Sequence, residues 1–95
     1  MSLKQAYEQK LKAQLDEWKT EIDKLKARAD KAEADVQLEY YKQIETLREK
    51  QEAAHDKLRE LENAGEDAWE DLKAGIESAW DDLRDSIKSA TSRFK

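Results

Sequence analysis

The single histidine is the residue whose position most suggests a chemical function. His55 follows Glu52 at the Glu-x-x-His spacing, which in di-iron helical bundles places two metal ligands on one face of a helix. Such a site also needs a second motif and two further inward glutamates. An antiparallel dimer centred on Ile44 would supply the motif twice and bring Glu33 opposite His55, but two helices enclose no cavity. We therefore predict that Glu33 and His55 flank a helix interface as a charge pair, and that there is no metal site.

Catalysis has little support from the remaining side chains. Only His55 could act as a base for the serine and threonine hydroxyls, and a straight helix surface forms no pocket around them. Adjacent acids such as Glu66 and Asp67 are numerous, and we interpret them as solvated surface charges. We predict that the chain is not an enzyme and that it has no catalytic residues and no cofactor.

Composition favours long helices over a compact globule rich in turns. Charged residues make up 43% of the 95 residues, against about a quarter in ordinary globular domains. There is no proline and there are only two glycines, so the chain has few residues that form turns. It has no cysteine, no signal-peptide core near Tyr7 and no apolar run long enough to cross a bilayer. We predict a cytoplasmic protein.

The charge balance argues against nucleic acid as a partner. The formal net charge is −5, and basic residues form no stripe that could displace counterions from phosphates. We predict no nucleic-acid binding.

Apolar residues recur at steps of three and four along almost the whole chain. The mean step of about 3.6 residues matches the natural period of a straight α-helix, and the period-two alternation of strands is absent. We predict an all-α fold in which one apolar stripe forms an association seam. The seam consists of Leu11, Leu15, Trp18, Ile22, Leu25, Val36, Tyr40, Ile44, Leu47, Leu58, Leu61, Trp69, Leu72, Ile76, Trp80, Leu83, Ile87 and Phe94.

The last third contains an 11-residue (hendecad) repeat. The segment DAWEDLKAGIE at 67–77 is followed by SAWDDLRDSIK at 78–88, so that Trp69 aligns with Trp80. The same 11-residue spacing connects Leu58 to Trp69 across Gly65 without a shift of phase. This continuity favours a single helix, about 135 Å long at 1.5 Å per residue.

A helical hairpin is the alternative that the sequence leaves open. Gly65 could end a first helix in the left-handed conformation, and Asp67 with Glu70 could form a capping box for a second. In both topologies residues 1–95 form one coiled-coil unit, with a hinge or turn at 62–67 in the hairpin.

Either topology leaves large apolar side chains in water, at about 1.5–3 kcal/mol for each one. We therefore predict a homo-oligomeric coiled coil or helix bundle, that is, a non-enzymatic structural or interaction protein. The wide face around Trp69 and Trp80 gives an alternative, because it resembles the lipid-surface helices of apolipoproteins and the repeats of desiccation-protection proteins. A peripheral lipid-binding or stress-protective role is disfavoured by the acidic polar face, which anionic lipid would repel.

Three segments carry a resemblance to a known group of proteins. They are EYYKQIETLREKQ at 39–51, EDAWEDLKAGIESAWDDL at 66–83 and SATSRFK at 89–95. The chain resembles small uncharacterised bacterial proteins described as coiled-coil domain-containing, and the Ala-Trp repeat is the most specific part. The resemblance implies bacterial origin and helical architecture. It implies no activity, partner or functional residue.

Overall fold

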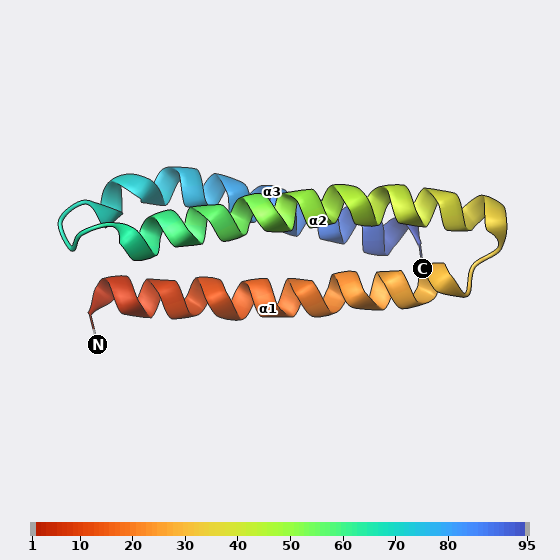
Figure 1. Cartoon of the computed structure of the whole chain (residues 1–95), viewed down its shortest axis with the longest axis horizontal. Coiled ribbons are helices and arrows are strands. Elements are labelled where there is room, and N and C mark those ends of the chain that lie inside the picture. Colours follow the sequence, from red (N-terminus) through yellow and green to blue (C-terminus); the bar gives the residue numbers. More distant parts are fainter. Residues whose placement is uncertain (1, 95) are drawn as a thin grey trace.

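The chain folds into an elongated bundle of three helices joined by two reversals (Figure 1). The structure is a computed structural model that describes residues 2–94. Helix α1 spans Leu3–Asp30, α2 spans Ala34–Asn63 and α3 spans Lys73–Arg93, and the 3₁₀ helix η1 at Trp69–Leu72 leads into α3. Helices α1 and α3 run in the same direction and α2 runs against them. The all-α prediction is confirmed, but the chain is neither one continuous helix nor a two-helix hairpin.

The first reversal, at residues 31–33, was not predicted. The N–H of Lys31 donates to the carbonyl of Arg28 and the N–H of Ala32 donates to the carbonyl of Ala29, both at 3.1 Å, and Glu33 then turns the chain through an extended conformation. The side-chain amide of Gln37 donates to the same Ala29 carbonyl at 3.0 Å and ties the start of α2 to the end of α1. Because no residue here adopts a positive φ, the reversal needs neither glycine nor proline.

The second reversal lies at residues 64–68, where the hairpin alternative had placed a break. Ala64 leaves α2 in an extended conformation, and the carbonyl of Gly65 accepts from the N–H groups of Ala68 (3.1 Å) and Trp69 (3.2 Å). The left-handed conformation predicted for Gly65 is wrong, because no glycine has a positive φ.

The capping box predicted at this reversal does not form either. The residues that precede η1 and α3 are Ala68 and Leu72, and neither helix start receives a side-chain cap. The Gly65 carbonyl orders the turn instead, and Asp67 and Glu70 stay exposed.

The core contains most of the predicted seam. Every seam residue is buried except Val36, which is 46% exposed, and Trp18 and Leu72, which are half-buried. Val36 is exposed because α2 begins afresh after the first reversal, so its phase does not continue that of α1. The third helix covers the stripe that two helices would have left in water. Burial of the stripe therefore does not require a second chain.

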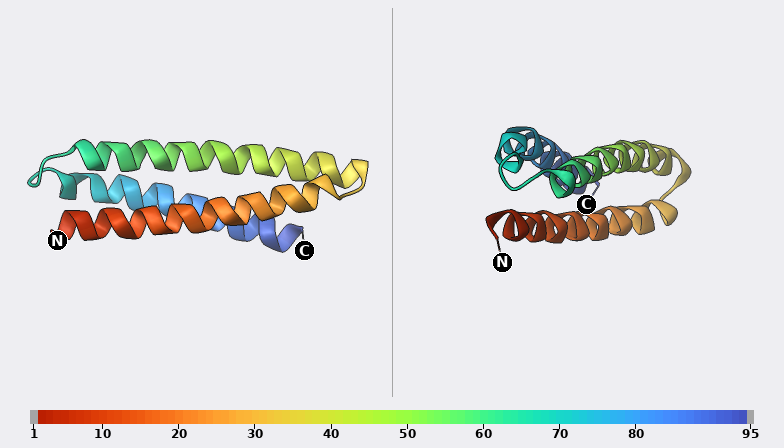
Figure 2. Two further views of the ribbon diagram at one scale, coloured as in Figure 1. Left: turned by 60° about the horizontal axis from the view of Figure 1, so that its bottom comes forward. Right: turned by 60° about the vertical axis from the view of Figure 1, so that its left-hand side comes forward.

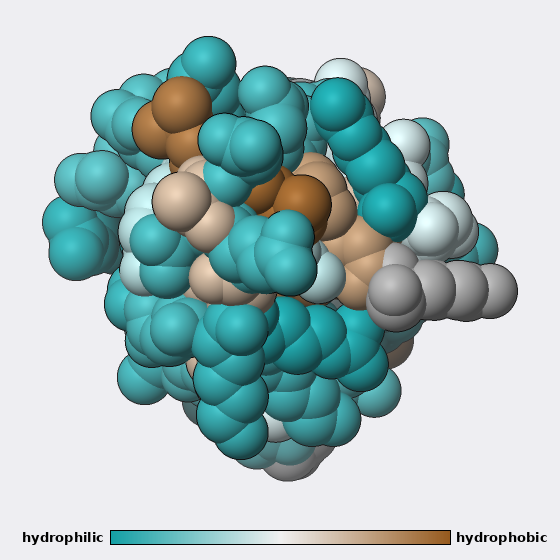
Figure 3. Space-filling view, turned by 90° about the vertical axis from the view of Figure 1, so that its right-hand side faces the viewer, coloured by the Kyte–Doolittle hydropathy of each residue, from teal (hydrophilic) through white to brown (hydrophobic). Residues whose placement is uncertain are grey.

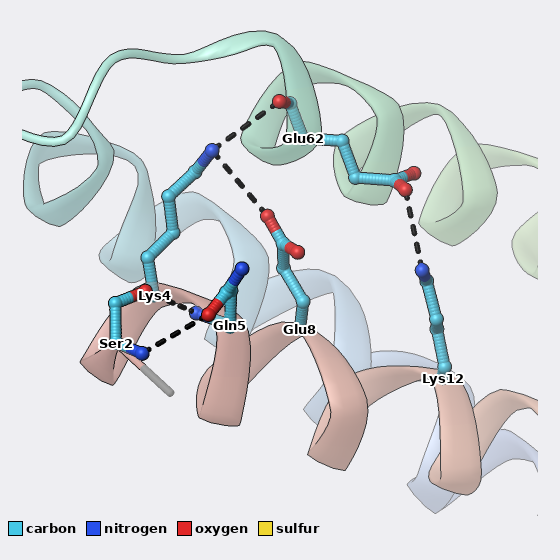
Figure 4. A network of polar contacts seen from close by, with 6 residues as sticks. All are labelled: Ser2, Lys4, Gln5, Glu8, Lys12 and Glu62. Carbon is cyan, nitrogen blue, oxygen red and sulfur yellow. Dashed lines mark hydrogen bonds and ion pairs between the residues drawn. The ribbon is translucent and has the colours of Figure 1, made fainter.

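A polar network fixes the start of α1 against the end of α2 (Figure 4). The hydroxyl of Ser2 accepts from the Gln5 N–H at 3.1 Å while the Ser2 N–H donates to the Gln5 side chain at 3.1 Å, which forms a capping box. The Lys4 ammonium donates to the Glu62 carbonyl at 3.3 Å, and the Lys12 ammonium lies 3.3 Å from the Glu62 carboxylate. These contacts align α1 and α2 along their length.

Candidate interaction groove

Helix α2 packs against both other helices, whereas α1 and α3 contact each other least. Figure 2 shows α2 running back alongside α1 and α3 running back alongside α2. Helices α1 and α3 are joined near their ends. The Tyr7 and Trp69 rings lie 5.7 Å apart at one end, and the Arg28 guanidinium donates to the Phe94 carbonyl at 3.5 Å at the other.

Between these two joints lies a row of hollows that we call the α1/α3 groove. Three hollows follow one another and share lining residues: Tyr7 and Lys10 line both the first and the second, and Trp18 and Arg84 line both the second and the third. The central hollow has a volume of about 250 Å³. Its lining consists of Tyr7, Lys10, Leu11, Gln14, Trp18, Glu77, Trp80, Asp81 and Arg84.

Aromatic side chains form much of the groove surface. Trp80 is 4% exposed and packs into the core, while Trp18 is only half-buried because no helix covers its outer side. At the first hollow, the Lys73 ammonium lies 4.8 Å from the centre of the Trp69 ring and 5.5 Å from that of Tyr7, within the range of cation–π attraction. A large amphipathic side chain that is left partly open is typical of interaction surfaces.

Two buried polar atoms in the central hollow lack hydrogen-bond partners. They are the hydroxyl of Tyr7 and the indole N–H of Trp80. Buried tyrosine and tryptophan side chains ordinarily satisfy these groups. Burial raises the pKa of Tyr7, and the negative charge of Glu77 raises it further. Both atoms lie below the surface of the hollow, so neither is exposed to an incoming group.

Ion pairs cross both faces of α2 but not the groove. Lys12 pairs with Glu62 between α1 and α2, and Lys50 lies 3.0 Å from Asp82 between α2 and α3. Within residues 2–94, no ion pair joins α1 to α3. Charged side chains stand on both walls of the groove without meeting.

His55 and Glu33 do not form a site within the chain. Glu33 precedes α2 and His55 is an exposed residue in the second half of α2, so about 33 Å of helix separates them at 1.5 Å per residue. The proposed centre of an antiparallel pair, Ile44, is 5% exposed and packs in the core. Across the described part of the chain, no group of three or more His, Cys, Asp or Glu side chains is placed to hold a metal ion.

A second apolar surface lies at the end of the bundle that carries the first reversal. Val36, Leu38 and Tyr41 are exposed there, and Figure 3 shows hydrophobic surface at this end divided by hydrophilic side chains. The Tyr41 hydroxyl donates to the Asp30 carboxylate at 2.7 Å, and Lys26 also donates to it at 2.7 Å. These two hydrogen bonds lower the pKa of Asp30.

The groove itself was not predicted from the sequence. Trp18 was assigned to the seam, but Tyr7, Lys10 and Gln14 were not recognised as lining a shared surface. The one available signal was the charge order along the two helices, which only becomes meaningful once α1 and α3 are known to be parallel neighbours.

Fold and groove together define a three-helix bundle with a row of hollows on its α1/α3 face and a further hollow of about 400 Å³ between α1 and α2, whose lining includes Leu15, His55 and Leu58. No family model, curated protein or solved structure matches the chain significantly, so the resemblance to bacterial coiled-coil proteins stays a prediction. In residues 2–94 no helix is both long and apolar enough to span a membrane.

Proposed function

We propose that this protein is a non-enzymatic interaction module that self-associates through the α1/α3 groove. The observation that carries the proposal is a half-buried tryptophan, Trp18, which lines two adjoining hollows of the groove. A second copy covering the groove would bury the open side of Trp18. Burial of aromatic anchors near the centre of an interface is the usual source of binding energy.

A contact of standard size would cover most of one side of the molecule. The molecule measures 52 by 20 Å, so one whole side projects about 1,000 Å², against the roughly 800 Å² per partner of a standard interface. The described lining residues of the three hollows include no histidine, cysteine or serine. This supports an interaction role over nucleophilic catalysis.

The lipid-surface alternative has weaker support. Trp69, Trp80 and Phe94 are 5%, 4% and 8% exposed, so a membrane would have to open the bundle before these side chains could insert. We expect anionic vesicles to leave the tryptophan emission unchanged. A blue shift with a gain of helix would favour the lipid alternative.

Sedimentation velocity over a concentration series tests the proposal. We expect a concentration-dependent dimer for the natural sequence, and a dissociation constant at least tenfold higher for Trp18→Ala, which is about 1.4 kcal/mol. Leu38→Ala is the matched control, because Leu38 is 59% exposed at the end of the bundle and away from the groove. Monomers at every concentration, or a dimer lost with Leu38→Ala and kept with Trp18→Ala, would overturn the proposal.

A further inference from the structure

We propose that the first reversal is a hinge that straightens, and that two copies of the chain then exchange their α1 helices. In the exchanged dimer α1 and α2 form one helix from Leu3 to Asn63, about 90 Å long at 1.5 Å per residue, and α1 of each copy packs on α2 and α3 of the other. This dimer is a second mode of self-association, and it does not depend on the α1/α3 groove. The residues of the reversal, its few contacts and the exposure of Val36 support the exchange.

The three residues that form the reversal are all good helix formers. They are Lys31, Ala32 and Glu33, and lysine, alanine and glutamate are among the residues with the highest helix propensity. None of them has a positive φ, and neither glycine nor proline occurs between Leu3 and Asn63. The second reversal differs, because it contains a glycine. A continuous helix through residues 31–33 therefore meets no residue that opposes it.

Few contacts hold the reversal closed. Helix α2 starts after Glu33 without a side-chain cap, so its first N–H groups lack the partner that a cap supplies. In a continuous helix the N–H groups of residues 34–36 donate to the carbonyls of residues 30–32. The Ala29 carbonyl then accepts from the Glu33 N–H, so straightening releases the Gln37 amide that holds the turn. The packing of α1 on the other helices re-forms between copies, so exchange costs only the contacts of the reversal.

Straightening also places an open apolar side chain on the buried stripe. Val36 is 46% exposed, although it lies eleven residues from both Leu25 and Leu47, which are 2% and 1% exposed. Eleven residues are about three helical turns. In a continuous helix the three side chains therefore share one face.

The antiparallel register of α1 and α2 puts this valine where the two long helices cross. Lys4 donates to the Glu62 carbonyl and Arg48 pairs with Asp23, so the α1–α2 pair is centred between residues 33 and 36. Exchange keeps this register but forms its contacts between copies. Val36 of each copy then lies close to the two-fold axis of the dimer, where the two side chains cover each other.

Proline at the first position of α2 tests whether the hinge straightens. Glu33 has φ −64° and ψ 152°, the extended conformation that a residue before proline prefers, and the first helical position tolerates proline. Ala34→Pro therefore fits the reversal but interrupts a continuous helix. After refolding from guanidinium chloride at high protein concentration, we expect a dimer of the natural sequence on size-exclusion chromatography and at least about a hundredfold less with Ala34→Pro. The melting temperature of the Ala34→Pro monomer should not fall, which shows that the variant folds.

Two lysine substitutions form a matched pair at the crossing. Val36→Lys removes apolar burial near the dimer axis and sets two ammonium groups there, so it should reduce the exchanged dimer about tenfold. Leu38→Lys makes the same kind of change at a side chain that is 59% exposed and lies off the stripe, and should change the dimer by less than about twofold. An equal loss in both variants would contradict the crossing at Val36.

A distance within one chain identifies the exchange. Ala13 and Ala53 are exposed, and the register of Lys4 with Glu62 puts them at the same level of α1 and α2. The chain has no cysteine, so Ala13→Cys with Ala53→Cys carries two spin labels for double electron–electron resonance. With labelled chains diluted in the natural sequence, the exchanged dimer should give about 60 Å, whereas the closed bundle should give a distance near its 20 Å width.

The outcomes separate the exchange from the groove. A dimer that gives only the short distance and weakens with Trp18→Ala would overturn the exchange and leave the groove standing. A dimer that gives the long distance, disappears with Ala34→Pro and persists with Trp18→Ala supports the exchange and removes the groove as its contact. A long distance that remains with Ala34→Pro would overturn the hinge. A natural sequence that stays monomeric after refolding and at every concentration would overturn both proposals.

Discussion

The two faces of α2 differ from the α1/α3 face in how they are closed. Both α2 faces combine fully buried aliphatic side chains, such as Leu47 and Leu61, with ion pairs that cross between helices. The α1/α3 face has contacts at its two ends and hollows between them, with a half-buried Trp18. The apolar stripe is thus covered unevenly. The ion pairs hold α2 to both of its neighbours, whereas Trp18 stays partly open on the α1/α3 face.

The two kinds of face should differ most in how far the loss of an apolar side chain lowers the free energy of unfolding. Leu47, in the middle of α2, is 1% exposed, so Leu47→Ala should lower the free energy of unfolding by about 2–5 kcal/mol. Trp18→Ala should cost less although tryptophan is larger, because its outer side is already in water. Urea unfolding at a concentration that keeps the protein monomeric measures both. Equal costs would mean that the groove is as closed as the core.

The two reversals extend the comparison, because only the second contains a glycine. A Cβ added at Gly65 would meet nothing within 4 Å, and its φ is not positive. Gly65→Ala should therefore raise the free energy of unfolding by about 0.4–1 kcal/mol, by restricting the unfolded chain. Gly75→Ala, inside α3 with the same free space, should gain about 1 kcal/mol in helix propensity. A loss of stability with Gly65→Ala would indicate a strained reversal.

Removing the ammonium group that bridges a closed face should have a smaller effect. Lys50 donates to Asp82 at 3.0 Å and to Ser86 at 2.6 Å, and connects α2 to α3. Because its side chain is about one-third exposed, Lys50→Ala should cost only about 0.2–1 kcal/mol. The same change at Lys10, on the open face, should leave the stability of the monomer unaffected. The melting temperatures of both variants at low protein concentration test this difference. An equal loss of stability in Lys50→Ala and Lys10→Ala would contradict it.

The smallest expected effect concerns the hydrogen bonds that Asp30 accepts near the first reversal, and it depends on pH. Hydrogen bonds from Lys26 and Tyr41 hold the pKa of Asp30 below its usual 3.8. A carboxyl group with a depressed folded-state pKa stabilises the fold above the unfolded pKa and loses that contribution as pH falls through the folded value. The difference in melting temperature between the natural sequence and Asp30→Asn should therefore be present at pH 7 and vanish near pH 2. Asp16→Asn, at an exposed carboxylate outside the ion pairs of the described chain, is the control.

Sequence periodicity identified the core well because burial in a helix bundle follows one face of each helix. It did not identify the first reversal, because the steps from Ala29 to Ala32 and Val36 imitate a continuing stripe and no glycine or proline marks the turn. The Gln37 amide holds this turn by donating to the carbonyl of Ala29, eight residues earlier in the chain. The spacing of apolar residues gives no sign of this contact. The capping box of Ser2 and Gln5, by contrast, has a recognisable Ser-x-x-Gln pattern.

The open face could not be predicted because it depends on the distance between two helices that are not neighbours in sequence. The stripe predicts that α1 and α3 each bury a face, but it contains no information on how closely the two approach each other. The earlier requirement for a second chain rested on two helices being too few to cover the stripe. With three helices the stripe is covered within one chain, and the association that we propose involves only the surface that they leave open.

Small-angle X-ray scattering in the dilute limit tests most directly whether one chain covers its own stripe. The compact bundle predicts a radius of gyration for a single copy close to 15.4 Å, measured over Cα atoms, with a small increase from side chains and hydration. A continuous helix about 135 Å long would give a value near 40 Å. A monomeric species with the larger value would contradict the three-helix bundle, and with it the groove between α1 and α3.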